Sequence, residues 1–220
     1  ITESLRVNKN VSIFDHQIRA AQRIKNDFGG SALLSDEVGL GKTVEAGIII
    51  KEFIVTSLAK KVLILAPPSL LPQWQDEMMS KFNLDFVSQK GDSRFVNVFS
   101  HDLLLMSHSS AVFPNYSESL KDTFWDILVV DEAHSMKNPS TRKHQLVKNL
   151  SKRHLLLLSA TPVQNNLSEL YSIVDLLRPG YLGTWGQFKE KYSLDKKSRT
   201  LNPVSQKELQ DILSKVIIRT

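Results

Sequence analysis

The stretch Asp36-Glu37-Val38-Gly39-Leu40-Gly41-Lys42-Thr43 indicates the fold class of this chain. It follows an apolar run, Ala32 to Leu34, and precedes a helix-like run from Val44 to Leu58. The order of strand, glycine-bearing loop and helix is the setting in which a Gly-Lys-Thr sequence forms a phosphate-binding loop. Gly39 and Gly41 permit tight turns and leave backbone N–H groups free to face phosphate oxygens.

The side chains of this loop fit a nucleotide bound with Mg²⁺. Lys42 reaches the β- and γ-phosphates, and the Thr43 hydroxyl is a ligand for the metal. The helix N-terminus near Thr43 adds partial positive charge. Asp36 replaces the first glycine of the general pattern, and a chance turn with a surface lysine is the alternative. The predicted nucleotide-binding residues of the loop are Asp36, Glu37, Val38, Gly39, Leu40, Gly41, Lys42 and Thr43.

A second candidate site follows the apolar run Ile127 to Val130, which is typical of a buried parallel strand. Asp131 and Glu132 come directly after it, at the strand end where open α/β sheets bind ligands. We expect Asp131 to hold Mg²⁺ through water and Glu132 to orient or deprotonate the attacking water. The alternative is a helix start, since both residue types favour a first helical turn.

A third candidate site follows the apolar run His154 to Leu158, which predicts another buried strand. This strand leads into Ser159-Ala160-Thr161-Pro162. The hydroxyls of Ser159 and Thr161 either sense the nucleotide or cap the turn that Pro162 enforces.

Composition and charge limit the class of protein. The chain has 220 residues, of which 41% are hydrophobic and 23% charged, as in an ordinary globular domain. It contains no cysteine, which excludes disulfides and thiolate metal sites. The net charge of +5 suits a polyanionic partner. No apolar stretch is long enough to span a bilayer, so we expect no membrane partner.

Strands and helices alternate along the chain, which predicts an α/β fold with a mostly parallel central sheet flanked by helices. After Pro179 the pattern becomes helical and charged, which predicts a helical C-terminal extension. The expected helices span 13–28, 44–58, 70–82, 141–150, 167–177 and 185–197, and a short helix precedes 216–218. The expected strands span 32–34, 61–66, 86–88, 96–99, 127–130 and 154–158.

With these three sites in this order, the chain resembles the first motor lobe of superfamily 2 nucleic-acid-dependent ATPases, within the Swi/Snf-type branch. Ala66 to Leu71, followed by Gln73-Trp74 and Glu77, matches the second motif of that branch. Also typical are Lys137-Asn138, Asn165 to Leu170 and Leu176 to Pro179. Val38 and Glu45-Ala46-Gly47 are more similar to bacterial and archaeal members, which include the RapA-like proteins.

The resemblance implies a RecA-like P-loop domain. Residues 1–183 would form the ATP-binding lobe, and residues 184–220 a basic helical extension leading toward a second lobe of the same protein. In the family, that second lobe supplies arginine fingers across the nucleotide, and no such motif follows here. We therefore expect the full-length protein to hydrolyse ATP and this lobe alone to be nearly inactive.

The resemblance also assigns roles to residues outside the three sites. Gln17 would contact adenine, with simple polarity of a helix face as the alternative. Ser69 would touch a nucleic-acid phosphate, and Lys137 and Asn138 are further candidates for that contact. His134 would link the acidic residues to the other motifs. The alternative for a basic residue such as Lys137 is a solvated surface position without a partner in nucleic acid.

The function implied is that of an ATP-dependent translocase on double-stranded DNA, which displaces or remodels nucleoprotein complexes without fully separating the strands. ATP and Mg²⁺ are the implied cofactors. The implied partners are the DNA phosphate backbone, without sequence preference, and RNA polymerase or another nucleoprotein complex. A cytoplasmic, nucleoid-associated location follows from the similarity to prokaryotic members. The alternatives are an unwinding helicase, a restriction-type motor, or a nucleotide-binding docking module without turnover.

Overall fold

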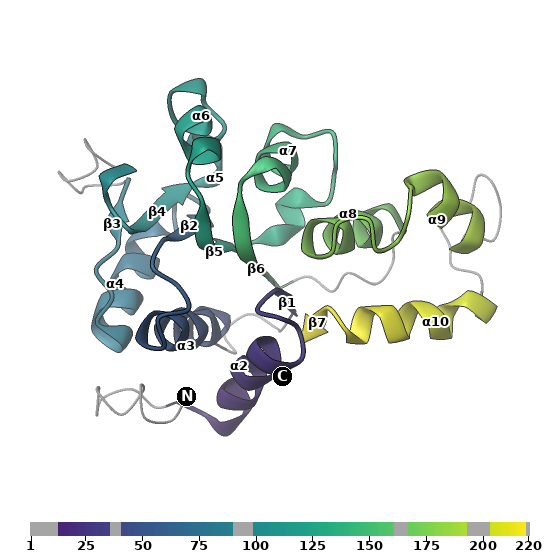
Figure 1. Ribbon diagram of the computed structural model, residues 1–220, viewed down its shortest axis with the longest axis horizontal. Coiled ribbons are helices and arrows are strands. Elements are labelled where there is room, and N and C mark those ends of the chain that lie inside the picture. Colours follow the sequence, from purple (N-terminus) through teal and green to yellow (C-terminus); the bar gives the residue numbers. More distant parts are fainter. Residues whose placement is uncertain (1–12, 36–40, 90–98, 161–166, 193–202, 219–220) are drawn as a thin grey trace.

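One parallel sheet organises the molecule (Figure 1). The computed structural model describes residues 13–35, 41–89, 99–160, 167–192 and 203–218. The described strands form a seven-stranded sheet in the order β3-β4-β2-β5-β6-β1-β7, and every neighbouring pair is parallel. The strands are β1 (Ala32–Ser35), β2 (Val62–Ala66), β3 (Val87–Ser88), β4 (Leu103–Ser107), β5 (Trp125–Val130), β6 (Lys152–Ser159) and β7 (Ile217–Ile218).

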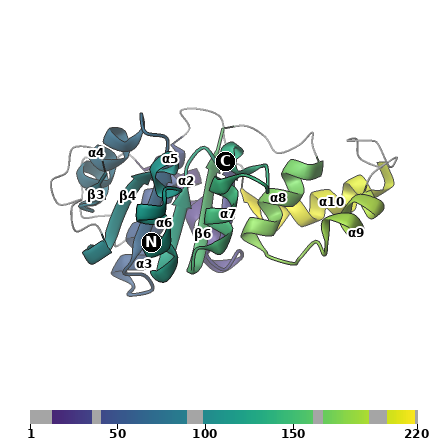
Figure 2. The same ribbon diagram turned by 90° about the horizontal axis from the view of Figure 1, so that it is seen from above.

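Helices cover both faces of the sheet (Figure 2). One face packs against α2 (Asp15–Asn26), α3 (Lys42–Val55) and α4 (Leu71–Phe82). The other packs against α5 (His108–Ala111), α6 (Pro114–Asp122), α7 (Arg142–Asn149) and α8 (Leu167–Leu177). A parallel sheet needs such cover on both faces, because its strands are joined by crossover helices.

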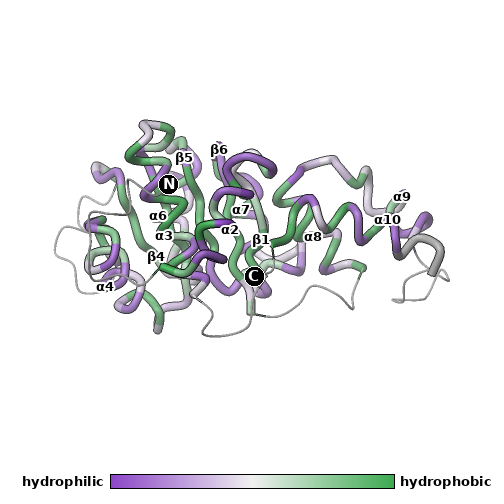
Figure 3. Tube along the Cα trace, turned by 90° about the horizontal axis from the view of Figure 1, so that it is seen from below, coloured by the Kyte–Doolittle hydropathy of each residue, from purple (hydrophilic) through white to green (hydrophobic). Residues whose placement is uncertain are grey.

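Alternate side chains of the central strands enter two separate cores. In β5, Leu128 and Val130 belong to the core under α5 to α8, whereas Ile127 and Val129 belong to the core under α2 to α4. All four are fully buried, so this part of the strand carries no polar face. The hydropathy of the chain trace shows the same division, with apolar strands inside and polar segments outside (Figure 3).

The α/β class, the parallel sheet and most expected elements are confirmed, with ends that differ by a few residues. The sequence does not predict β4, α5, α6, the short 3₁₀ helix at Ala133–Met136 or β7. Within the expected strand at 96–99, only Phe99 is described, and it does not lie in a strand. The strand between β3 and β2 is β4 instead, because its apolar residues pair with Val62–Ala66 along their whole length.

The C-terminal helices extend to one side of the sheet (Figures 1 and 2). They are α8, α9 (Trp185–Tyr192) and α10 (Pro203–Ser214), and Lys191 Nζ binds Glu208 Oε1 across the last two. The chain then returns to the sheet, since β7 pairs with β1 and Leu33 N–H donates to Val216 O over 2.8 Å. The division of the chain at residue 183 stays a prediction.

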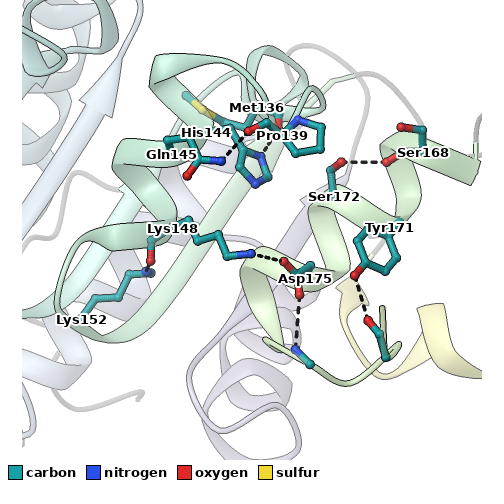
Figure 4. Close-up of polar contacts among 12 residues, drawn as sticks. Met136, Pro139, His144, Gln145, Lys148, Lys152, Ser168, Tyr171, Ser172 and Asp175 are labelled. Carbon is teal, nitrogen blue, oxygen red and sulfur yellow. Dashed lines mark hydrogen bonds and ion pairs between the residues drawn. The ribbon is translucent and has the colours of Figure 1, made fainter. Parts of the chain in front are cut away.

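Polar contacts hold α8 against α7 (Figure 4). Lys148 Nζ lies 2.8 Å from Asp175 Oδ2, and Gly180 N–H donates to Asp175 Oδ1 over 3.3 Å. Tyr171 donates its hydroxyl proton to the Gly183 carbonyl over 2.8 Å. The turn that follows α8 is thereby fixed to the helix.

None of the described helices is both long enough and apolar enough to cross a membrane.

Candidate nucleotide-binding site

The sheet order places the three sequence-predicted sites at one edge. The strands that precede them are β1, β6 and β5, which are adjacent in that order. Ser35 pairs with Ser159, and Val130 pairs with Leu157, so the three strands end at nearly the same level. Because parallel strands share a carboxyl edge, the start of α3, the acidic pair and Ser159 converge there.

The described end of the phosphate loop begins at Gly41. This residue has φ of 91° and caps α3, and its carbonyl accepts the N–H of Glu45 over 2.9 Å. The positive φ favours glycine, and a β-carbon here would lie 2.4 Å from Gln17 Nε2 and displace that amide. Lys42 and Thr43 follow as the first residues of α3, where backbone N–H groups lack intrahelical acceptors.

The remaining predicted loop residues lie outside the described part of the chain. They are Asp36, Glu37, Val38, Gly39 and Leu40. Their binding of phosphate therefore stays a prediction.

Gln17 lies beside this loop although it is far away in the sequence. It is 3% exposed, and its Oε1 accepts the N–H of Phe14 over 3.1 Å. Its amide nitrogen approaches Gly41, so Gln17 joins the start of α2 to the end of the phosphate loop. The adenine contact of Gln17 stays a prediction.

Asp131 lies at the end of β5 with 8% of its surface exposed. Its Oδ1 accepts the N–H of Glu132, and its Oδ2 accepts the indole N–H of Trp74, each over 2.8 Å. Burial raises the pKa of Asp131, and the two hydrogen bonds oppose that rise. Within the described residues it makes no ion pair. A buried carboxylate held in this way fits a divalent cation, because such a site gains most from an added positive charge.

Glu132 has left-handed backbone, with φ of 49° and ψ of 53°. A residue with a β-carbon pays roughly 1–2 kcal/mol for this conformation, which is common at functional sites. Its Oε2 lies 2.9 Å from Nδ1 of His134, and both side chains are partly exposed. The chain does become helical at once, in the 3₁₀ helix η2 (Ala133–Met136). The acidic pair therefore occupies both a strand end and a helix start.

Two neighbours of Asp131 were not predicted as site residues. Trp74 belongs to a motif of the family but has no predicted role, and His108 follows β4, a strand that the sequence does not predict. His108 is 4% exposed, and burial lowers its pKa to about 4, with the charge of Lys143 acting in the same direction. Hydrogen bonding to the backbone at Asp131 and Leu65 opposes this shift. His108 is therefore neutral at physiological pH.

The other predicted site residues have varied surroundings. Ser159 is buried at the end of β6, and Thr161 lies outside the described residues. Ser69 is exposed in the turn before α4. Lys137 Nζ lies 3.0 Å from Glu169 Oε1, and Asn138 Oδ1 accepts both N–H and O–H of Ser140.

These surroundings leave the predicted roles open to test. Lys137 has a carboxylate partner within the chain, and Asn138 stabilises its own turn. Their contacts with nucleic acid, and the coupling roles of His134, Ser159 and Thr161, stay predictions.

Comparison with known proteins gives relatives over nearly the whole chain. The family model of the SNF2-related domain matches residues 16–220. An "Uncharacterized ATP-dependent helicase YqhH" of Bacillus subtilis (strain 168) is 41% identical over 204 residues, which cover 93% of this chain and 35% of that protein. The RNA polymerase-associated protein RapA of Cronobacter sakazakii is 35% identical over 197 residues, covering 83% of this chain and 20% of that protein.

Solved structures agree with the sequence matches. The SWI2/SNF2 ATPase core of Sulfolobus solfataricus in complex with dsDNA superposes with a TM-score of 0.84 at 28% identity. The match covers 97% of this chain and 45% of that one, which confirms the RecA-like fold. This chain thus spans less than half the length of these relatives. The family match, the fold and the order of the motifs agree, and the chain belongs to the SNF2-related domain family.

Proposed function

We propose that this chain is the ATP-binding lobe of a Swi/Snf-type motor that moves along double-stranded DNA. The observation that carries the proposal is the buried, hydrogen-bonded carboxylate of Asp131 at the end of β5. The adjacent strand, β6, ends at Ser159. Lys42 and Thr43 begin α3 at the same edge. A phosphate loop facing an acidic pair is the arrangement used for phosphoryl transfer from a nucleotide.

Each residue of the site has a proposed part in ATP hydrolysis. Lys42 and the N–H groups at the start of α3 bind the phosphates, and Gln17 contacts adenine. Thr43 and Asp131 would hold Mg²⁺, which would neutralise charge on the phosphate oxygens. Glu132 orients the attacking water and accepts its proton. The ring of His134 contacts Glu132. His134 and the hydroxyls of Ser159 and Thr161 couple the presence of bound nucleotide to the conformation of the rest of the lobe.

The proposed nucleic-acid partner is duplex DNA, contacted through its phosphates. The SWI2/SNF2 core of similar fold is described in complex with dsDNA, and the net charge of this chain is +5. Ser69 is exposed at the carboxyl edge of the sheet, and Lys137 and Asn138 follow the acidic pair. RNA polymerase or another nucleoprotein complex is the proposed target, because the RapA relative is associated with RNA polymerase. A second RecA-like lobe of the same protein would complete the cleft.

The proposal is tested on the full-length protein with two assays. ATP hydrolysis is measured with and without two unrelated duplexes over a salt series, with Lys42→Ala as the inactive control. We expect equal stimulation by both duplexes and weaker binding as salt rises, because the contacts are to phosphates. A strong preference for one duplex would contradict this.

The second assay uses a DNA triplex, and it separates the alternatives. Release of the third strand with the duplex intact indicates a translocase. Separation of the duplex strands indicates an unwinding helicase, the activity in the name of the Bacillus relative. Nucleotide binding with neither release nor turnover indicates a docking module.

A further inference from the structure

The indole of Trp74 is bonded to the acidic residue that we assign to magnesium. Trp74 lies in the first turn of α4 and is 1% exposed. Its Nε1–H donates to Asp131 Oδ2 in a buried hydrogen bond of 2.8 Å. The residues are 57 positions apart, and they meet because β2, which leads into α4, is adjacent to β5. An indole has a single N–H, and here it is used on a carboxylate.

The two oxygens of Asp131 are held by different donors. Oδ1 accepts the backbone N–H of Glu132, and Oδ2 accepts the indole, so rotation of the carboxylate would break at least one bond. Each carboxylate oxygen accepts more than one hydrogen bond, so both retain capacity for a water bound to a metal. Groups that orient a metal ligand in this way change metal affinity by roughly 10–100-fold when they are removed.

The backbone around Trp74 continues into the turn at residues 67–70. Leu70 N–H donates to Pro67 O over 3.0 Å, and Trp74 N–H donates to Leu70 O over 2.9 Å. Ser69 is exposed within this turn, where the proposed function places a DNA phosphate. Two consecutive hydrogen bonds therefore connect this turn to the backbone of Trp74.

We propose that Trp74 is a positioning residue for Asp131. It holds the carboxylate in the orientation that binds the magnesium–nucleotide complex, and it links that orientation to the turn carrying Ser69. This inference rests on the proposed function. Since coupling between two binding sites is reciprocal, duplex DNA at the turn and the magnesium–nucleotide complex at Asp131 raise each other's affinity through Trp74.

A second buried tryptophan provides a matched control. Trp125 is fully buried at the start of β5, and its Nε1–H donates to the Leu120 carbonyl over 3.1 Å. Phenylalanine at either position removes one buried hydrogen bond and part of a buried ring. Only Trp74→Phe removes a donor from a carboxylate.

The first experiment measures nucleotide affinity by calorimetry over a Mg²⁺ series, with melting temperatures for both variants. We expect Trp74→Phe to raise the Mg²⁺ concentration for half-maximal binding by about tenfold, and to leave nucleotide affinity in EDTA unchanged. Trp125→Phe should keep the parent Mg²⁺ dependence although it also lowers the melting temperature. A parent-like Mg²⁺ dependence in Trp74→Phe overturns the inference and leaves the proposed function standing. If nucleotide affinity of the parent protein does not depend on Mg²⁺, both the inference about Trp74 and the proposed function are overturned.

The second experiment tests the link to DNA. Saturating duplex should lower the half-maximal Mg²⁺ concentration in the parent and in Trp125→Phe, and should have no effect in Trp74→Phe or Ser69→Ala. An equal effect of duplex in all four proteins overturns the coupling.

A third measurement needs no variant that must fold. Indole-labelled protein gives one N–H resonance for each tryptophan, and three of these tryptophans belong to this chain. Adding Mg²⁺ to the nucleotide-bound protein should shift the Trp74 resonance and leave that of Trp125 in place. A Trp74 resonance that ignores Mg²⁺ contradicts the inference even if Trp74→Phe does not fold.

Discussion

Asp126 and Asp131 lie near opposite ends of β5, and their surroundings differ. At the amino end, Asp126 Oδ2 accepts the backbone N–H groups of Lys60 and Lys61 over 2.8 and 2.9 Å. Its Oδ1 lies 3.7 Å from the Arg153 guanidinium, so the protein itself supplies a positive charge. At the carboxyl end, Asp131 has two hydrogen bonds and, within the described residues, no ion pair.

The contrast extends along both edges of the sheet. The amino edge holds a cavity of about 690 Å³ whose charged lining residues pair with each other, as Lys60 does with Asp102 and Arg153 with Asp126. The carboxyl edge holds Asp131, whose pKa burial raises, and the neutral His108. The same residue type is thus structural at one edge and suited to a ligand at the other.

The largest expected effect is at Glu132. Glutamine keeps the shape of the side chain but cannot accept a proton, so Glu132→Gln should lower DNA-stimulated ATP hydrolysis by roughly 10²–10⁴-fold. ATP affinity and melting temperature should stay at the parent values, because the side chain is partly exposed. Turnover and calorimetry of the full-length protein measure this. If Glu132→Gln hydrolysed ATP at the parent rate, the acidic residues of the carboxyl edge would have a structural role, as Asp126 has at the amino edge.

The next effect is at Asp131. Asp131→Asn should weaken Mg²⁺-dependent nucleotide binding by roughly tenfold or more, because the ligand loses its charge. Nucleotide affinity in EDTA should hardly change. The phenotype therefore differs from that of Glu132→Gln, in which binding is retained. Equal Mg²⁺ dependence in parent and Asp131→Asn would mean that this carboxylate holds no metal.

Asp126→Asn applies the same chemical change to the other end of β5. The carboxylate accepts both backbone N–H groups through one oxygen and pairs with Arg153 through the other. An amide has only one accepting oxygen and cannot do both, so we expect a loss of about 1–3 kcal/mol in unfolding free energy. The Mg²⁺ dependence of nucleotide binding should be that of the parent. Denaturant unfolding and calorimetry on the same sample measure both. A changed Mg²⁺ dependence would show that the two edges are not independent.

The smallest effect is expected for Arg153, whose side chain is half exposed. Arg153→Gln should cost less than about 1 kcal/mol, because exposed ion pairs are weak and screened by salt. Lys60→Gln, at an even more exposed pair, is the matched control. If Arg153→Gln destabilised the protein as much as Asp126→Asn, the ion pair rather than the backbone hydrogen bonds would anchor the amino edge.

The sequence by itself determined the parts that depend on local pattern. The order of apolar run, glycine-bearing loop and helix around Lys42 predicts β1 and α3, and the apolar run before Asp131 predicts β5. These predictions hold because buried parallel strands are continuously apolar and the site residues follow them directly. The sequence does not predict β4, because an apolar run of four residues, Leu103 to Met106, does not distinguish a strand from a buried helix.

Only the tertiary structure decided which distant side chains complete the site. Trp74 bonds to Asp131, and His108 lies near the backbone of the same residue. Gln17, which the family resemblance already assigns to the site, lies beside Gly41. None of these contacts has a local sequence signal. They follow from the strand order, in which β2 lies between β4 and β5, and from the helix that each strand leads into. Spacing along the chain fixes which residues end a strand, whereas the packing of the whole sheet fixes which strand ends are neighbours.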